Sequence, residues 1–175
     1  MMHIHKLKKY YFINEFNQNH LINLNKNISF IWRNKDKETS IKNLIELRDF
    51  CKKNQRCFYI SNDVKLAQKM NADGVYISST NKNLNLKTTN LKKNFRIIGS
   101  AHNLKEIKIK ELQNTKEIFL SPLFKKKTNQ QLNIFRYLKL RATTKMNDIS
   151  LGGINNKNLK KLNMIKPFGF AGISY

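Results

Sequence analysis

The sequence has few cysteines, prolines, glycines and acidic residues. Its 175 residues include 2 Cys, 2 Pro and 6 Gly. Such low glycine and proline contents exclude a collagen-like chain, and two cysteines are too few for a disulfide-stapled scaffold. No apolar run approaches the roughly 20 residues that cross a bilayer, and the basic N-terminal segment lacks the apolar core of a signal peptide. We therefore expect a cytoplasmic protein, without a membrane partner, whose Cys51 and Cys57 are reduced.

Acidic residues are scarce enough to leave a large positive charge. The chain carries 34 Lys+Arg against 11 Asp+Glu, a formal net charge of +23. Clustered cations suit nucleic acids. Of the 34 basic residues, however, 28 are Lys and only 6 are Arg, the residue that binds bases and phosphates through two hydrogen bonds at once. Lys, Asn and Ile make up 72 of the 175 residues, as A/T-rich codons produce in any protein. We expect no nucleic-acid partner, although a nucleic-acid-binding protein remains an alternative of a different class.

A hydrophobic fraction of 40% indicates a folded core, and the length fits a single domain over residues 1–175. Short apolar runs, typical of strands buried on both faces, cover residues 10–13, 28–32, 57–60, 74–77, 95–98, 118–120, 148–151 and 169–173. Helical patterns cover residues 39–53, 63–70, 104–112, 131–140 and 156–164, whereas the polar stretch 79–94 favours irregular structure.

This alternation predicts an α/β fold with parallel strands and right-handed crossovers. Eight runs favour a compact (β/α)8 TIM barrel with minimal units. Because the chain stops at Tyr175, directly after the last run, we expect no final outer helix. A doubly wound open sheet is the alternative, but the glycine-rich turn that usually follows its first strand is absent.

In either architecture the carboxyl ends of the strands carry the site. Polar or cationic residues follow most of the runs, and the sequence there also resembles a known family. The resembling segments are Tyr59-Ile60-Ser61-Asn62-Asp63, Asn71-Ala72-Asp73-Gly74-Val75, Ile98-Gly99-Ser100-Ala101-His102, Leu120-Ser121-Pro122-Leu123-Phe124 and Leu151-Gly152-Gly153-Ile154. In this order and spacing they resemble the thiamine phosphate synthase and TenI-type thiazole tautomerase superfamily.

The resemblance implies a (β/α)8 barrel and a transferase of thiamine biosynthesis. Such an enzyme couples an aminopyrimidine diphosphate to a thiazole phosphate, releases pyrophosphate and uses Mg²⁺; oligomeric state is not readable from it. By resemblance, Arg33 and Lys35 hold the pyrophosphate, Asn62 holds the pyrimidine diphosphate, and Asp63 and Asn81 ligate Mg²⁺. The remaining positions carried over are a site serine at Ser100, an acid/base candidate at His102, and thiazole phosphate contacts at Lys126, Thr128, Gly152, Gly153, Ile173 and Ser174.

The chain also departs from the family pattern. Ile31 stands where the family has glutamine, Asn81 where it has an acidic metal ligand, and Lys126 and Asn129 replace a threonine and a lysine. These departures leave open a TenI-type tautomerase, for which His102 would move the proton, or a catalytically degenerate paralogue. Asn62 has a second interpretation as well, since asparagine commonly caps a helix.

Overall fold

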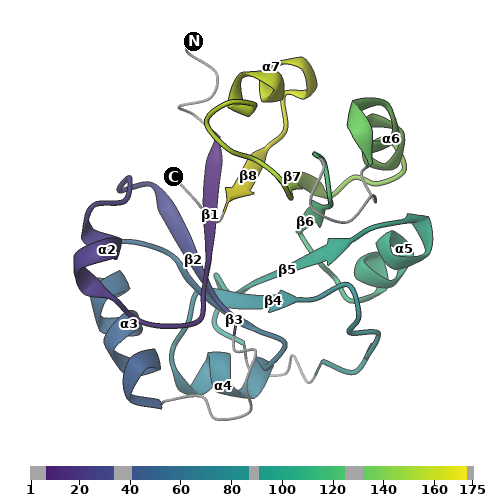
Figure 1. Ribbon diagram of the computed structural model, residues 1–175. Helices are drawn as coiled ribbons and strands as arrows, with labels where there is room; N and C mark the ends of the chain where they lie inside the picture. Colours follow the sequence, from purple (N-terminus) through teal and green to yellow (C-terminus); the bar gives the residue numbers. More distant parts are fainter. Residues whose placement is uncertain (1–6, 34–40, 87–90, 125–131, 173–175) are drawn as a thin grey trace.

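The structure, a computed structural model, is a closed barrel of eight parallel strands with helices outside the ring (Figure 1). It describes residues 7–33, 41–86, 91–124 and 132–172. Each strand pairs with the next along the chain, and β8 pairs with β1 to close the ring. The strands are β1 (Lys8–Ile13), β2 (Ile28–Trp32), β3 (Phe58–Ser61), β4 (Gly74–Ile77), β5 (Arg96–Ala101), β6 (Glu117–Leu120), β7 (Asn147–Leu151) and β8 (Gly169–Gly172). The predicted TIM barrel is confirmed, and the open sheet is excluded.

Helices connect most of the strands. They are α2 (Gln18–Ile22), α3 (Ile41–Lys53), α4 (Val64–Lys69), α5 (Leu104–Leu112), α6 (Asn133–Arg141), the 3-10 turn η1 (Leu159–Lys161) and α7 (Leu162–Ile165). In the described parts of the β4–β5 connection, residues 78–86 and 91–95, the chain forms turns and no helix, as its polar sequence predicts. No helix within the described ranges is both long enough and apolar enough to span a membrane.

Two connections differ from the sequence-based expectation. The helix expected from residue 156 begins at Leu159 as a 3-10 turn, because Asn155 and Asn158 hydrogen bond within a turn instead. The five-residue helix α2 was not predicted. It has a single buried residue, Leu21, which is too little to form a recognisable helical pattern. The helix starts where the Asn17 side chain accepts a hydrogen bond from the His20 backbone N–H at 3.1 Å.

One large or apolar side chain from each strand fills the barrel interior. This layer consists of Tyr10, Ile31, Tyr59, Tyr76, Ile98, Phe119, Ile149 and Ala171. Its rings meet edge to face, for example Tyr76 and Phe119 at a centroid distance of 5.5 Å, an arrangement that aromatic quadrupoles favour. The interior is therefore a packed core, and chemistry is restricted to the ends of the barrel.

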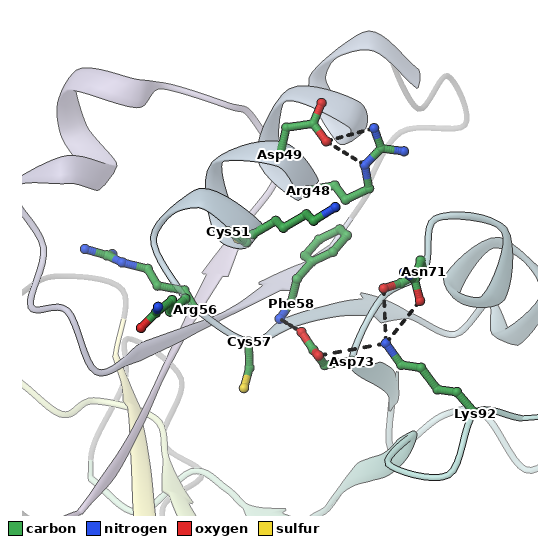
Figure 2. Close-up of a pocket in the computed structure, with 11 residues that line it drawn as sticks. Arg48, Asp49, Cys51, Arg56, Cys57, Phe58, Asn71, Asp73 and Lys92 are labelled. Atoms are coloured by element: carbon green, nitrogen blue, oxygen red, sulfur yellow. Dashed lines mark hydrogen bonds and ion pairs between the residues drawn. The ribbon is translucent and has the colours of Figure 1, made fainter.

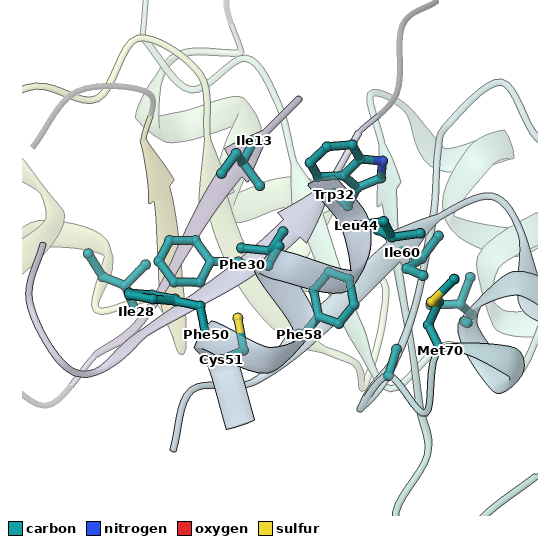
Figure 3. Packing of buried hydrophobic residues seen from close by; sticks show 14 of the residues in the cluster. Ile13, Ile28, Phe30, Trp32, Leu44, Phe50, Cys51, Phe58, Ile60 and Met70 are labelled. Carbon is teal, nitrogen blue, oxygen red and sulfur yellow. The ribbon is translucent and has the colours of Figure 1, made fainter. Parts of the chain in front are cut away.

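The outer faces of the strands pack against the helices in two clusters. The larger one lies between the first strands and α3, where Phe30 and Phe58 of the sheet meet Leu44 and Phe50 of the helix (Figure 3). The second cluster joins β5, β6 and β8 to α5, α6 and α7. Together they fix the strand ends, and thereby the loops that follow them.

Candidate active site at the carboxyl ends of the strands

The loops after β3 and β4 are tied together by Asn62. Its backbone N–H donates to the Tyr76 carbonyl at 2.7 Å, and its side-chain oxygen accepts from the Ser78 backbone N–H at 2.8 Å. The Asn81 amide also donates to that oxygen, at 3.4 Å. Asn62 adopts a left-handed backbone, with φ of 61°, which asparagine tolerates better than most residues. Two of the predicted site residues are thus brought together.

Asp63, not Asn62, caps the helix after β3. Its Oδ1 accepts a hydrogen bond from the Leu66 backbone N–H at 2.8 Å, at the first turn of α4. The interpretation of Asn62 as the helix cap is therefore wrong, because Asn62 lies one residue too early and its side chain turns to the β4 loop. The side chain of Asp63 is exposed at the same barrel end.

Ser100 lies in the barrel interior just below this loop pair. The Tyr76 hydroxyl donates a hydrogen bond to the Ser100 Oγ at 2.8 Å, and Ser100 is buried. Burial raises the pKa of the Tyr76 phenol, whereas the bond to Ser100 and the positive charge of Arg33 act in the opposite direction. The exposed Arg33, directly after β2, therefore acts electrostatically on the same end of the interior.

His102 is held by the loop after β6. Its Nδ1 lies 2.7 Å from the Ser121 carbonyl oxygen and 3.1 Å from the Ser121 Oγ. A carbonyl oxygen only accepts, so Nδ1 carries the proton and donates to it. In the neutral ring this leaves Nε2 as the basic nitrogen. The His102 backbone N–H donates to Glu106 at 2.7 Å, which fixes the residue at the start of α5.

Gly152 and Gly153 form a tight turn after β7. Both have positive φ, 97° and 70°. The Gly152 carbonyl accepts from the Phe124 backbone N–H at 3.1 Å, and a Cβ on Gly153 would lie 2.8 Å from the Phe124 carbonyl oxygen. Only glycine fits this approach of the β6 and β7 loops.

Not every predicted site residue can be placed. Lys35, Lys126, Thr128, Ile173 and Ser174 lie outside the described residues. Among the residues that are described, no group of three or more His, Cys, Asp or Glu side chains could hold a metal ion by itself. The placed residues instead offer amides, one hydroxyl, one imidazole, one carboxylate and one guanidinium, a set suited to binding a polar, anionic ligand.

Two buried polar residues at this end were missed from the sequence. Lys110 and Gln113 of the α5 region both donate to the Asn81 carbonyl, at 2.8 and 3.1 Å. Lys110 follows the buried Ile107 by three positions on α5, so it occupies a helix face that would normally carry an apolar side chain. A lysine at a helix position that is normally apolar is the sequence signal that could have revealed the contact of Lys110.

A cavity of about 490 Å³ lies at the opposite end of the barrel, at the start of β3 and β4. None of the predicted site residues that the structure describes lines it. Its cations are partly satisfied, since Arg48 pairs with Asp49 at 2.8 Å and Lys92 lies 3.9 Å from Asp73 (Figure 2). Cys57 is exposed here, whereas burial raises the pKa of the neighbouring Cys51 thiol to about 12.

Comparisons with known proteins agree with the architecture and with the resemblance. Residues 23–175 match the family model described as thiamine monophosphate synthase. The thiamine-phosphate synthase of Pelagibacter ubique is 30% identical over 170 residues, which cover 93% of this chain and 81% of that protein. A thiamine-phosphate synthase of Prochlorococcus marinus is 31% identical over 122 residues, 67% of this chain but 35% of that protein.

A solved structure supports the fold. The thiamine phosphate pyrophosphorylase of Pyrococcus furiosus superposes with a TM-score of 0.70, covering 98% of this chain and 87% of that one, at 16% sequence identity. At this identity the likeness concerns the fold alone.

Proposed function

The chain belongs to the thiamine monophosphate synthase family, and from this membership we propose that it is a transferase that makes thiamine phosphate. The reaction joins the ring nitrogen of a thiazole phosphate to the methylene carbon of an aminopyrimidine diphosphate. The bond between that carbon and the diphosphate oxygen breaks, and pyrophosphate leaves. The proposed location is the cytoplasm, where free thiols such as Cys51 and Cys57 stay reduced.

The observation that carries this proposal is the junction of the β3 and β4 loops at Asn62 and Asn81. The amides lie together, and the exposed Arg33 directly follows β2 at the same end of the barrel. A leaving diphosphate gains charge as the carbon–oxygen bond breaks, so fixed donors and a cation at that point stabilise the transition state. We assign this end to the diphosphate of the pyrimidine substrate, with Lys35 as a further cation.

The residues at this end of the barrel also fit a magnesium ion that the substrate phosphates would help to bind. Mg²⁺ is usually bound by one or two carboxylates, several waters and substrate phosphates, rather than by a complete protein cage. Asp63 uses one oxygen in the helix cap, and a carboxylate has acceptor capacity beyond that single bond. Asp63 and Asn81 would hold the ion, which would offset the negative charge of the leaving diphosphate.

The thiazole phosphate is assigned to the turn after β7. Gly152 and Gly153 adopt positive φ, a backbone that brings N–H groups close to an anion without an intervening side chain. Lys126, Thr128, Ile173 and Ser174 are proposed to complete this phosphate site. Ser100 and His102 are proposed to contact the reacting rings between the two phosphate sites.

Growth of a thiamine-requiring bacterial strain that lacks its own synthase tests this proposal. The wild-type chain is expected to restore growth without thiamine. Arg33→Ala is expected to abolish or strongly slow that growth, because it removes a cation from the diphosphate end. Arg48→Ala, the same change at the opposite barrel end, serves as the control and is expected to grow like wild type.

Two results would contradict the proposal. The first is absence of growth although the wild-type chain is present in the soluble fraction. The second is equal growth with Arg33→Ala and with wild type, which would exclude the assigned diphosphate end.

A further inference from the structure

Lys110 is a fully buried lysine, with 0% of its surface exposed. It belongs to α5, but its ammonium group reaches the loop after β4. The Nζ donates to the Asn81 carbonyl at 2.8 Å and to the Gln113 side-chain oxygen at 2.8 Å. A charged side chain from one helix thus fixes the backbone of a loop that precedes it by 29 residues.

Gln113 completes this contact from the end of the same helix. Its side-chain nitrogen donates to the carbonyls of Asn81 and Asn83, at 3.1 and 2.8 Å, and Gln113 is itself buried. Two buried polar side chains therefore hold two carbonyls of the β4 loop. Because these carbonyls are held, the peptide groups that carry them keep a fixed orientation. The position from which the Asn81 side chain projects is then fixed as well.

The neighbouring strand leaves room for the lysine. A Cβ on Gly99 of β5 would lie 2.9 Å from the Lys110 Cδ, closer than such carbons approach each other, and 3.2 Å from the Thr115 Cγ2. Glycine at this position is what allows the lysine stem to cross β5. The path of Lys110 is thus supported by a second residue, on a different element.

A lysine is an expensive choice for a buried position. Transfer of an ammonium group out of water costs free energy unless it is well paired, and burial lowers the pKa of Lys110 to about 8. Methionine or leucine would fill the same space without that cost. The two hydrogen bonds from the ammonium group offset part of this cost, and an apolar side chain could not form them.

We propose that Lys110, together with Gln113, is a positioning residue for the diphosphate end of the site. It fixes the β4 loop so that the Asn81 amide stays beside Asn62, where the family resemblance puts a metal ligand. This inference rests on the proposed function for its catalytic consequence, but not for the loop contact itself. Because Asn81 is neutral, its contribution to ion binding depends on position rather than on charge.

The test compares Lys110→Met with Lys108→Met, in purified full-length protein. Methionine keeps the length of the buried stem and removes the ammonium group. Lys108 lies on the same helix, but its side chain is 60% exposed and pairs with Glu111. Gln113→Met is a second variant that removes the remaining donors to the loop, so the test does not depend on the folding of one variant.

Two measurements are made on each protein. Hydrogen exchange of the amides of residues 78–86 is expected to be about tenfold faster in Lys110→Met and unchanged in Lys108→Met. The Mg²⁺ concentration that gives half-maximal activity is expected to rise about tenfold in Lys110→Met, as for other residues that orient a metal ligand, while kcat at saturating Mg²⁺ changes far less.

The outcomes separate the inference from the proposed function. Unchanged exchange in both Lys110→Met and Gln113→Met would overturn the loop contact. Faster exchange without any change in the Mg²⁺ requirement would overturn the positioning role. If the wild-type protein makes no thiamine phosphate, the proposed function fails on its own. The inference is then tested by the protection of residues 78–86 against hydrogen exchange when Mg²⁺ and pyrophosphate are added. Loss of this protection in Lys110→Met supports the inference, and equal protection in both proteins overturns it.

Discussion

Replacement of Asp63 by asparagine is expected to lower the rate of thiamine phosphate formation by about 100-fold, the usual scale for loss of one electrostatic group from an active site. Asparagine retains an oxygen that accepts from the Leu66 N–H and caps helices as well as aspartate does. The substitution therefore removes the charge proposed to bind Mg²⁺ while keeping the cap. The free energy of unfolding is expected to change by less than about 1 kcal/mol, the upper range of a charge–helix-dipole term.

Asp63→Ala separates the two roles further. It removes the cap as well, and is expected to cost about 1 kcal/mol of stability beyond the asparagine variant, with no further large loss of rate. Asp49→Asn is the matched control, since Asp49 is exposed and pairs with Arg48 at the other barrel end. Full activity in Asp63→Asn, measured with limiting Mg²⁺, would show that this carboxylate binds no metal.

Glu117→Ala is expected to lower the free energy of unfolding by about 2 kcal/mol, the scale of hydrogen bonds to a charged group, because its partners Lys8 and Arg96 are partly exposed. Glu117 begins β6 and is 3% exposed. Its Oε1 lies 2.6 Å from the Lys8 Nζ and 3.4 Å from the Arg96 guanidinium, and its Oε2 accepts from the buried Tyr10 hydroxyl. The carboxylate thus joins β1, β5 and β6 at the amino-terminal end of the barrel.

Urea unfolding at constant m measures this effect. Glu117→Gln keeps an acceptor but loses the charge, so a smaller loss than with alanine is expected. Glu111→Ala is the control: Glu111 forms a partly exposed pair with Lys108 on α5, and such pairs contribute about 0–1 kcal/mol. A loss no larger for Glu117→Ala than for Glu111→Ala would contradict a stabilising role for this cluster.

Strand positions were predictable because buried parallel strands read as short apolar runs. The runs at 28–32 and 74–77 coincide with β2 and β4, and the other six lie within two or three residues of the observed bounds. β5 extends to Ala101 through Gly99 and Ser100, which are small or polar. No hydrophobic pattern marks such residues, although Ser100 faces the interior and bonds to Tyr76.

Parts of the site were not predictable from local sequence. The sequence suggested a capping role for Asn62, and only the hydrogen bonds show that Asp63 caps α4 instead. The contact of Lys110 with Asn81 joins residues on different units, and its signal is a cation on an apolar helix face in a chain already rich in lysine. Because the chain is rich in lysine, Lys110 does not stand out in the sequence as a buried residue.

Incubation of the purified protein with the aminopyrimidine diphosphate, the thiazole phosphate and Mg²⁺ tests the central claim most directly. We predict thiamine phosphate and pyrophosphate in equal amounts, with no product when either substrate or Mg²⁺ is omitted. Absence of product in the wild-type protein, and equally in a variant carrying Asn81→Asp and Asn129→Lys, would contradict the assignment of a synthase activity to this chain.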